Sequence, residues 1–382
     1  MRIFKWTLCS IAAAMLSASA CAAQGSSAVF DVAQAASRRA TTAITAGEQG
    51  RSSQVNSWTV GIAGGFFEGT FIRFAVELAK ALDDGENLRI LPIVSYGGNE
   101  NINDLLYLKG VDIAITYTDT LELYKKSGRV RDIEQRINYI SELLVGEVYF
   151  FARPEIKTLA DLEGKKVSLG TKGNSATTTG PIVFGRLGIH PQLVFINNTI
   201  ALEKMKSGEI AAIVSTGGKP NDLFVKLKPE PGFHFLPVEY GGIFEDFYLP
   251  CPLSHDDYPQ LIGDGETVDT LCMSAVLAVY NFPRGSDQAR RVERFIHYYF
   301  ERFERLKEPS FHPKWKEVNL AAKVPGWNRY WAAEERFAAM AKPAKEGAGR
   351  AAQETPPARD AARQEALFQE FLASKKRQGG SP

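Results

Sequence analysis

The chain has 382 residues, of which 45% are hydrophobic and 23% are charged, as is typical of a folded globular protein with room for two domains. Its 45 Lys and Arg residues nearly balance its 44 Asp and Glu residues, which gives a formal net charge of +1. This balance gives no indication of a nucleic-acid or membrane-surface partner, because both attract proteins with a clear excess of positive charge.

Residues 1–22 have the features of a secretory signal peptide. Arg2 and Lys5 precede an apolar stretch, and small residues follow it. The stretch is too short to span a bilayer of about 30 Å. Cleavage after Ala20 or Ala22 fits these small residues, and a lipoprotein with a lipidated Cys21 is the alternative. We therefore expect the mature protein in the periplasm.

Export changes how the four cysteines are interpreted. Cys9 leaves with the signal peptide and Cys21 is removed or lipidated, so Cys251 and Cys272 remain. An even pair in an oxidising compartment is most simply a disulfide, which would stabilise the turn-rich loop between the two residues by about 3 kcal/mol. Two unpaired thiols are the alternative. A metal site is less expected, because His255 is the only soft ligand nearby.

Strand and helix patterns alternate from residue 57 onward, after a small, polar segment at 23–56 that is interpreted as a flexible leader. Strands are predicted at 58–63, 88–95 and 111–116 with helices at 71–82 and 99–110, and then strands at 165–170, 193–196 and 209–216 with helices at 181–188 and 199–208. Such alternation predicts right-handed β-α-β units. The chain therefore contains two α/β lobes of the same plan.

Two further apolar runs are predicted to connect the lobes, one at 143–154 and one that returns at 272–283. The helix predicted at 286–307 has one apolar face and is expected to pack on the first lobe. We assign 57–148 to the first part of lobe 1, 149–272 to lobe 2, 273–337 to the completion of lobe 1, and 338–382 to an Ala-rich charged tail, which is a loose appendage or a partner-binding helix. The predicted fold class is α/β, with two similar lobes, two crossover strands and a ligand cleft between the lobes.

The loops at the carboxyl ends of the predicted strands hold the candidate binding residues. Ligands of open α/β sheets bind there, beside helix N-termini whose amides are unpaired. These loops offer glycine backbone, hydroxyls and amides, with Tyr117, Thr118 and Lys172 among their side chains, and this set suits a small anion. The first loop, GIAGGFFEG, lacks the spacing of either nucleotide-binding glycine motif.

Catalysis has little support in the sequence. It contains no G-x-S-x-G or H-E-x-x-H motif and no thiol with a plausible base. The five histidines are scattered, and the cluster SHDD at 254–257 is interpreted as a turn. We expect a binding protein without enzyme activity, cofactor or metal ion.

Four stretches carry a resemblance to a known family: IKTLADLEGKKVSLGTKGNSATTT at 156–179, VSYGGNENINDLLYLKGVDIAIT at 94–116, STGGKP at 215–220 and VPGWNRYW at 324–331. They resemble the solute-binding proteins of the TAXI subgroup of TRAP transporters, which have the class II periplasmic binding protein fold. The resemblance spans residues 58–337. It implies capture of a small organic anion, commonly an amino acid or carboxylic acid, closure at a hinge, and delivery to TRAP-type membrane permease subunits. A sensor or scaffold of the same fold, with the tail as partner-binding element, is the alternative.

The resemblance also implies a set of ligand-binding residues. They are Gly64, Gly65 and Thr70 after the first strand, Ser95, Gly97 and Asn99 after the second, Asn174, Ser175 and Thr177 in the second lobe, and Thr216, Gly217 and Gly218. The sequence departs from the family where Phe66, Phe67 and Glu68 interrupt the first loop, and where Tyr117, Thr118 and Asp119 replace a frequent glutamine. Carboxylates of Glu68 and Asp119 at the cleft would disfavour a dianion and favour a ligand with an ammonium group.

Overall fold

The computed structural model describes residues 46–67, 69–228, 230–246 and 248–341. The chain divides into a body that ends at Phe337 and a C-terminal unit that begins at Ala338. The signal peptide, Cys21, residues 23–45 of the leader, Glu68 and the tail beyond residue 341 lie outside the described residues, so the expectations for them stay predictions. Among the described helices, none is long and apolar enough to cross a membrane.

A ten-stranded sheet runs through the described part of the body, in the order β2-β1-β3-β10-β4-β7-β5-β6, with β8 beside β4 and β9 beside β10. The strands are β1 (Thr59–Gly65), β2 (Arg89–Val94), β3 (Ile113–Tyr117), β4 (Ile137–Ala152), β5 (Lys166–Ser168), β6 (Gln192–Val194), β7 (Ala212–Gly217), β8 (His234–Phe235), β9 (Leu249–Ser254) and β10 (Thr267–Tyr280). β1 pairs in parallel with β2 and β3, and β5 pairs in parallel with β6 and β7. Two parallel sets of three strands therefore form the two lobes.

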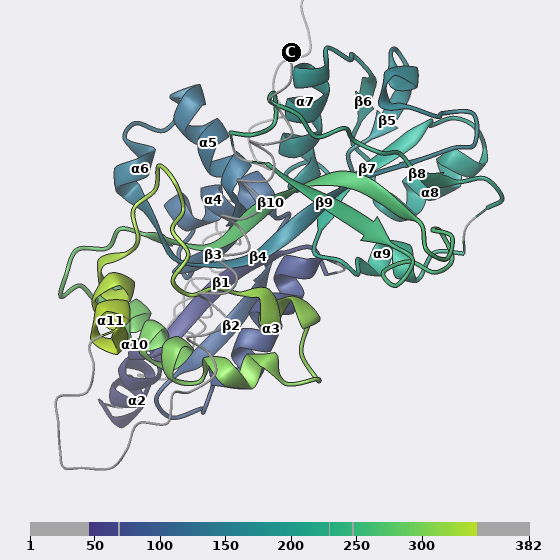
Figure 1. Ribbon diagram of the computed structural model, residues 1–382. Helices are drawn as coiled ribbons and strands as arrows, with labels where there is room; N and C mark the ends of the chain where they lie inside the picture. Colours follow the sequence, from purple (N-terminus) through teal and green to yellow (C-terminus); the bar gives the residue numbers. More distant parts are fainter. Residues whose placement is uncertain (1–45, 68, 229, 247, 342–382) are drawn as a thin grey trace, which may run out of the picture. The chain divides into compact units, whose positions relative to one another are not determined.

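Helices follow these strands in the expected alternation (Figure 1). The first lobe has α3 (Thr70–Leu82), α4 (Gly98–Tyr107), α5 (Thr118–Ser127) and α6 (Ile133–Arg136). The second lobe has η1 (Leu159–Leu162), α7 (Ala176–Leu187), α8 (Asn198–Lys206) and α9 (Asp222–Val225). Apolar side chains on one face of α3, such as Phe74 and Leu78, are fully buried, which is what the helical spacing of its sequence requires.

Two long antiparallel strands join the lobes. β4 pairs with β10 from Ile137 to Glu147, and it pairs with β7 of the second lobe from Glu147 to Ala152. β10 enters between β3 and β4 and runs antiparallel to both. The predicted fold class, two α/β lobes joined by two crossover strands, is confirmed.

The C-terminal part of the body packs on the first lobe, as the apolar face of the predicted helix indicated. It comprises α10 (Asp287–Glu301), η2 (Phe303–Lys307), η3 (Pro313–Glu317) and the part of α11 (Trp331–Ala341) that ends at Phe337. In α10, Phe295 and Tyr299 are fully buried. Arg291 bonds to the Asp112 carboxylate at 2.6 Å, and the other oxygen of Asp112 accepts from the Gly61 amide at 3.1 Å. This ion pair ties α10 to the start of β1 and β3.

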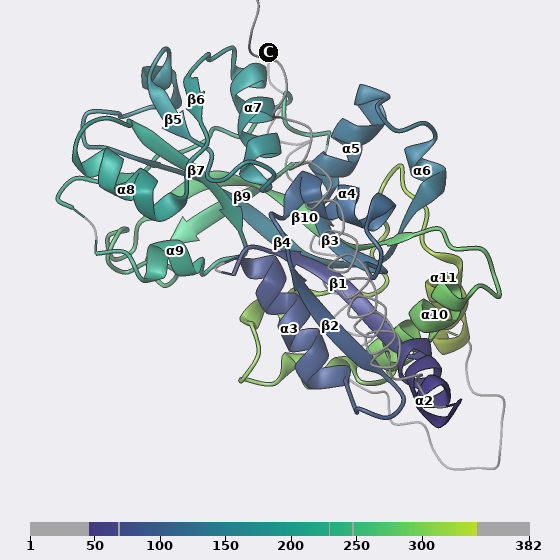
Figure 2. The ribbon, with the colours of Figure 1, turned by 180° about the vertical axis from the view of Figure 1, so that it is seen from behind.

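The end of the predicted leader is helical, which corrects one expectation. Residues 46–57 form α2 (Ala46–Ser57), a largely exposed helix (Figure 2). Its last turn is held by the Asn56 amide, which donates to the Ser52 carbonyl, and by the Thr59 hydroxyl, which donates to the Val55 carbonyl, both at 2.8 Å. Local hydrogen bonds between side chains and backbone do not produce an apolar pattern in the sequence, so this helix could not be predicted from apolar spacing.

The predicted disulfide joins Cys251 in β9 to Cys272 in β10, with a Cα–Cα distance of 5.8 Å. The loop between them has more support than its turn-rich sequence suggests. β9 and β10 pair over six residues, and Tyr258 is buried against Phe224 and Phe235. The SHDD cluster is a turn as predicted, and no group of potential ligands for a metal ion occurs among the described residues.

Candidate functional site

A pocket of about 120 Å³ lies between the two lobes, at the carboxyl ends of their parallel strands. It is lined by Gly64, Gly65, Phe66, Gly69, Thr70, Phe71, Tyr96, Gly97 and Tyr117 from the first lobe, and by Thr171, Asn174, Ser175, Ala176, Asn197, Asn198, Val214, Ser215, Thr216, Gly217, Asn221 and Leu223 from the second. None of these lining residues carries a charged side chain. Recognition in the described part of the pocket therefore depends on backbone groups, hydroxyls, amides and aromatic rings.

Several helices begin at the pocket, among them α3, α4 and α7. The N-cap residues of α3 and α4 are Gly69 and Gly97, and neither helix has a side-chain cap. Ser175 occupies the N-cap position of α7 and also provides no side-chain cap. The first amides of a helix have no partner within it and lie at the positive end of its dipole. Three such ends facing one cavity make it attractive to an anion.

A buried asparagine supports the loop that presents Gly97. The Asn101 amide donates to the Ile115 carbonyl at 2.6 Å and to the Ala63 carbonyl at 3.3 Å. The Ser95 hydroxyl donates to the Asn101 side-chain oxygen, and the Gly97 amide donates to the Ser95 hydroxyl at 3.2 Å. Ser95 therefore supports the pocket from behind instead of lining it.

The two lobes touch each other next to the pocket. Gly98, with a φ of +45°, lies so close to the second lobe that a Cβ atom on it would come within 2.7 Å of the Ser175 amide nitrogen. Thr70 in α3 accepts a hydrogen bond from the Gly218 amide of the second lobe at 3.1 Å. These contacts describe a closed arrangement of the two lobes.

Asp119 makes a second contact between the lobes and does not line the pocket, which corrects its expected place at the cleft. The side chain is fully buried at the start of α5. Its carboxylate accepts from the Thr179 hydroxyl of α7 at 2.6 Å and from the Tyr248 hydroxyl at 3.3 Å. Burial raises the pKa of Asp119 to about 6, against the hydrogen bonds that it accepts, which lower it.

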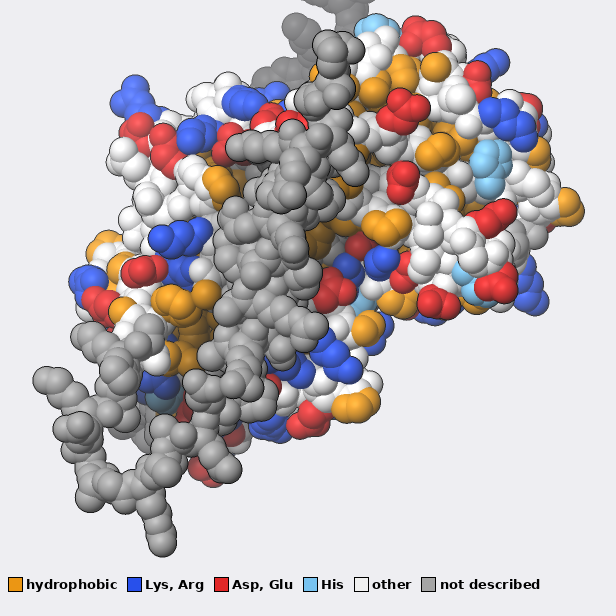
Figure 3. Space-filling model, in the orientation of Figure 1, with side chains coloured by type: hydrophobic (Ala, Val, Ile, Leu, Met, Phe, Trp, Pro, Cys, Tyr) orange, Lys and Arg blue, Asp and Glu red, His pale blue; other side chains and the backbone are white. Residues whose placement is uncertain are grey.

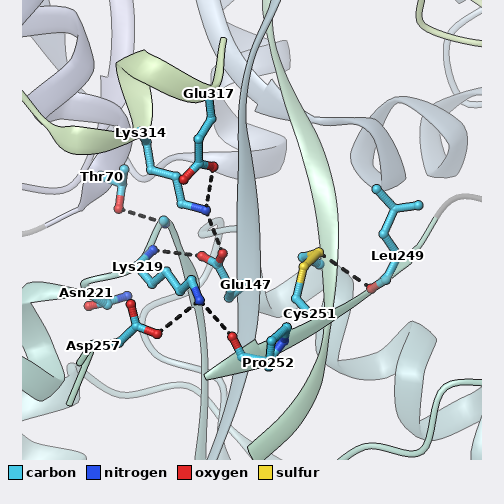
Figure 4. Close-up of polar contacts among 12 residues, drawn as sticks. Thr70, Glu147, Lys219, Asn221, Leu249, Cys251, Pro252, Asp257, Lys314 and Glu317 are labelled. Carbon is cyan, nitrogen blue, oxygen red and sulfur yellow. Dashed lines mark hydrogen bonds and ion pairs between the residues drawn. A yellow bond between two sulfur atoms is a disulfide. The ribbon is translucent and has the colours of Figure 1, made fainter. Parts of the chain in front are cut away.

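An ion pair on the crossover strand β4 lies beside the loop that follows β7 (Figure 4). One Glu147 oxygen contacts the Lys314 ammonium from η3 at 2.7 Å, and the other accepts from the Lys219 amide of the second lobe at 2.7 Å. Burial alone would lower the pKa of Lys314, but the Glu147 carboxylate raises it above its ordinary value. Burial raises the pKa of Glu147, against the bonds and charges of Lys314 and Lys219, which lower it. Glu147 lies opposite Gly217 in the sheet, and it therefore holds the 217–219 loop of the pocket.

The structure brings together nine of the predicted ligand-binding residues as pocket lining: Gly64, Gly65, Thr70, Gly97, Tyr117, Asn174, Ser175, Thr216 and Gly217. Six lie elsewhere: Ser95, Asn99, Thr118, Lys172, Thr177 and Gly218. The Lys172 ammonium lies 5.5 Å from the centre of the Phe195 ring, the Thr177 hydroxyl donates to the Asn174 carbonyl at 2.6 Å, and the Asn99 carbonyl accepts from Tyr124 at 3.0 Å. Thr118 is the first residue of α5.

Sequence reasoning missed Asn197 and Asn198, at the start of α8 after β6, and the aromatic residues Phe66, Phe71 and Tyr96. Asn197 and Asn198 line the pocket, and the buried Asn198 side-chain oxygen has no hydrogen-bond partner among the described residues. Phe66 and Tyr96 form a ring pair with centroids 5.6 Å apart at the first-lobe side. The rule that ligands meet strand ends would have found the asparagines, because they directly follow the strand predicted at 193–196.

Side chains of both signs are interspersed over the described surface that Figure 3 shows. On that face neither acidic nor basic residues gather into one large area.

Comparisons with known proteins relate most of the chain to one family. Residues 62–322 match the model of the NMT1-like family. A mutant of ArgBP from T. maritima has a similar solved structure, with 17% identity over 68% of this chain and 94% of that one, and a TM-score of 0.42. An amino acid ABC transporter substrate-binding protein from Streptococcus pneumoniae, bound to L-arginine, is 13% identical over 70% of this chain and 98% of that one, with a TM-score of 0.39.

Proposed function

Since the chain belongs to the NMT1-like family, we propose that it is a periplasmic solute-binding protein that captures a small organic anion between its lobes. The observation that carries the proposal is the pocket itself, which both lobes line and at which α3, α4 and α7 begin. The protein performs no catalysis in this proposal, and closure of the lobes around the ligand is its central event.

The lining residues favour one class of anion. Each helix N-terminus is equivalent to about half a positive charge, and hydrogen bonds to an ionised group become stronger when water is excluded. Without Arg or Lys among the described lining residues, the pocket suits one carboxylate better than two. An ammonium group would find no carboxylate among them, since Asp119 is committed to Thr179 and Tyr248. We therefore place monocarboxylates ahead of amino acids and dicarboxylates.

Delivery of this ligand to a TRAP-type membrane permease is part of the proposal. It is supported by the resemblance of residues 58–337 to the TAXI subgroup and by the features of a secretory signal at the N-terminus. Gene neighbours that encode the permease subunits would support it further. A protein that acts as a lone sensor would lack them.

A thermal-unfolding screen tests the proposal. The purified protein is heated with pyruvate, benzoate, succinate, L-glutamate and L-arginine, each at several concentrations, and hits are checked for one-to-one binding by native mass spectrometry. A ligand at 100 times its Kd stabilises the folded state by about 2.7 kcal/mol, so pyruvate or benzoate should raise the midpoint most. A panel in which no organic acid binds would contradict the proposed function.

A further inference from the structure

The carboxylate of Asp119 occupies an unusual place between the lobes. It belongs to the first turn of α5, and α5 lies beside α7 of the second lobe (Figures 1 and 2). Its hydrogen-bond partners are the hydroxyls of Thr179 and Tyr248 from the second lobe, together with the amide and hydroxyl of the adjacent Thr120. None of these partners is a cation. A full negative charge is thus buried with neutral donors only.

Among the described residues no cation bonds to Asp119, and the Arg186 guanidinium lies 5.6 Å from the ring centre of its partner Tyr248. Tyr117 faces it from β3 and Tyr248 from the segment before β9, and burial raises the pKa of both phenols, so they stay neutral. On α7, the Arg186 guanidinium is engaged with the Asp246 carboxylate at 2.7 Å. Beyond Tyr117 lies Glu147, which is paired with Lys314, and β10 contributes the neutral Met273.

Opening of the lobes would change this environment. α5 would separate from α7, and the carboxylate would lose the second-lobe hydroxyls and regain water. Building on the proposed closure around a ligand, we propose that Asp119 takes up a proton from solvent when the lobes close, so that low pH favours the closed, ligand-bound form. The Thr179 hydroxyl can accept from the protonated carboxyl, because its own hydrogen can turn to the Met273 sulfur 3.7 Å away.

The size and sign of the effect follow from proton linkage. Burial raises the pKa of Asp119 from 3.8 to about 6 in the closed form, and a water-exposed carboxyl in the open form has the ordinary value. The closed form therefore binds the proton more tightly. Affinity should be about tenfold higher at pH 5 than at pH 8, and it should level off above about pH 7, where both forms are ionised.

Titration calorimetry at pH 5 and pH 8 tests the proposal, with pyruvate, benzoate and L-glutamate as probes. The wild type is compared with Asp119→Asn, whose side chain at position 119 cannot titrate. Protonation of the probe changes the affinity of both proteins equally, so it cancels when their affinity ratios are compared. Glu142→Gln is the control, because Glu142 is a half-buried carboxylate whose pKa burial also raises, and it bonds to Ser274 within the β4–β10 pair. We expect the pH 5 to pH 8 affinity ratio of the wild type and the control to exceed that of Asp119→Asn about tenfold.

A second readout does not depend on that variant folding well. Binding at pH 5 measured in two buffers of different ionisation enthalpy should report uptake of about 0.9 proton. In Thr179→Val, which removes a donor to the ionised carboxylate, the affinity gain should begin at higher pH than in the wild type. Binding without proton uptake, or with equal ratios in wild type and Asp119→Asn, overturns the inference and leaves the proposed function intact. Absence of binding to every probe overturns both.

Discussion

Replacement of Gly98 by Ala should block closure of the lobes without damaging either lobe. Gly98 is the first residue of α4, and its neighbours across the interface are the backbone atoms of Asn174 and Ser175. Backbone atoms cannot turn aside as a flexible side chain can. An added methyl group therefore acts as a wedge between the lobes.

The structure gives the size of the effect. The added Cβ would lie 2.7 Å from the Ser175 nitrogen, and ordinary contact begins at 3.4 Å, so the lobes must move apart by about 0.7 Å. A rigid shift of that size would lengthen the 3.1 Å bond between Thr70 and Gly218 to about 3.8 Å, beyond hydrogen-bond range. The bond between Asp119 and Thr179 would weaken as well. Loss of one neutral and part of one charged hydrogen bond costs about 2–3 kcal/mol, or about 30- to 150-fold in affinity.

Gly128→Ala is the control for backbone strain. Gly128 also has a left-handed conformation, with a φ of +60°, but a Cβ there would meet nothing within 4 Å. Both variants should lose about 1 kcal/mol of folding stability, because a side chain disfavours this conformation. Only Gly98→Ala should lose affinity for the organic acids that the wild type binds, as measured by titration calorimetry. Equal affinity in the two variants would refute the reasoning.

Other predictions concern stability. Glu147→Gln leaves the buried Lys314 ammonium with the half-exposed Glu317, 3.0 Å away, as its remaining carboxylate partner, and it should lower the free energy of unfolding by up to about 3 kcal/mol. Urea titration should show part of this loss recovered when Lys314→Met is added, and no recovery would contradict the ion-pair assignment. Serine at both Cys251 and Cys272, which are 21 residues apart, should cost about 3 kcal/mol, and an unchanged urea midpoint would argue against a stabilising disulfide. Burial and nearby cations lower the pKa of His312 from 6.5 to about 4. The contribution of the neutral imidazole to the free energy of unfolding is therefore complete above pH 6.5, and it falls by about 2–3 kcal/mol on acidification to pH 4.5. His312→Gln should remove this part of the acid sensitivity, and an identical pH profile in the variant would contradict it.

The alternation of strands and helices could be read from the sequence, because burial on one helix face and on both strand faces leaves regular apolar spacing. The helix predicted at 71–82 is observed as α3 (Thr70–Leu82), and both crossover strands were found. β9 was not predicted, since LPCPLS contains two prolines that oppose pairing. Among the described strands β9 pairs with β10 alone, and an edge strand tolerates proline on its free side.

The candidate site was predictable at the level of loops and unpredictable at the level of contacts. Strand ends and glycines identified Gly64, Gly97 and Gly217, because local sequence determines where a parallel strand meets a helix. The pairing of Asp119 with Thr179 joins residues 60 positions apart in two lobes. No local pattern encodes such a contact. Its physical origin is the packing of α5 against α7, which depends on the whole fold.

The place of β10 has a consequence for how the chain folds. β3 and β4 are consecutive in sequence, yet β10 lies between them in the sheet. Until residues 267–280 arrive, the first lobe has a gap with two unpaired strand edges, the kind of surface on which other chains add strands. The strands of lobe 2, from β5 to β7, pair over much shorter stretches of chain. When the chain emerges from its N-terminus, the parallel strands β5 to β7 can thus pair before β10 is present, and the first lobe depends on a strand that begins more than a hundred residues after β4 begins.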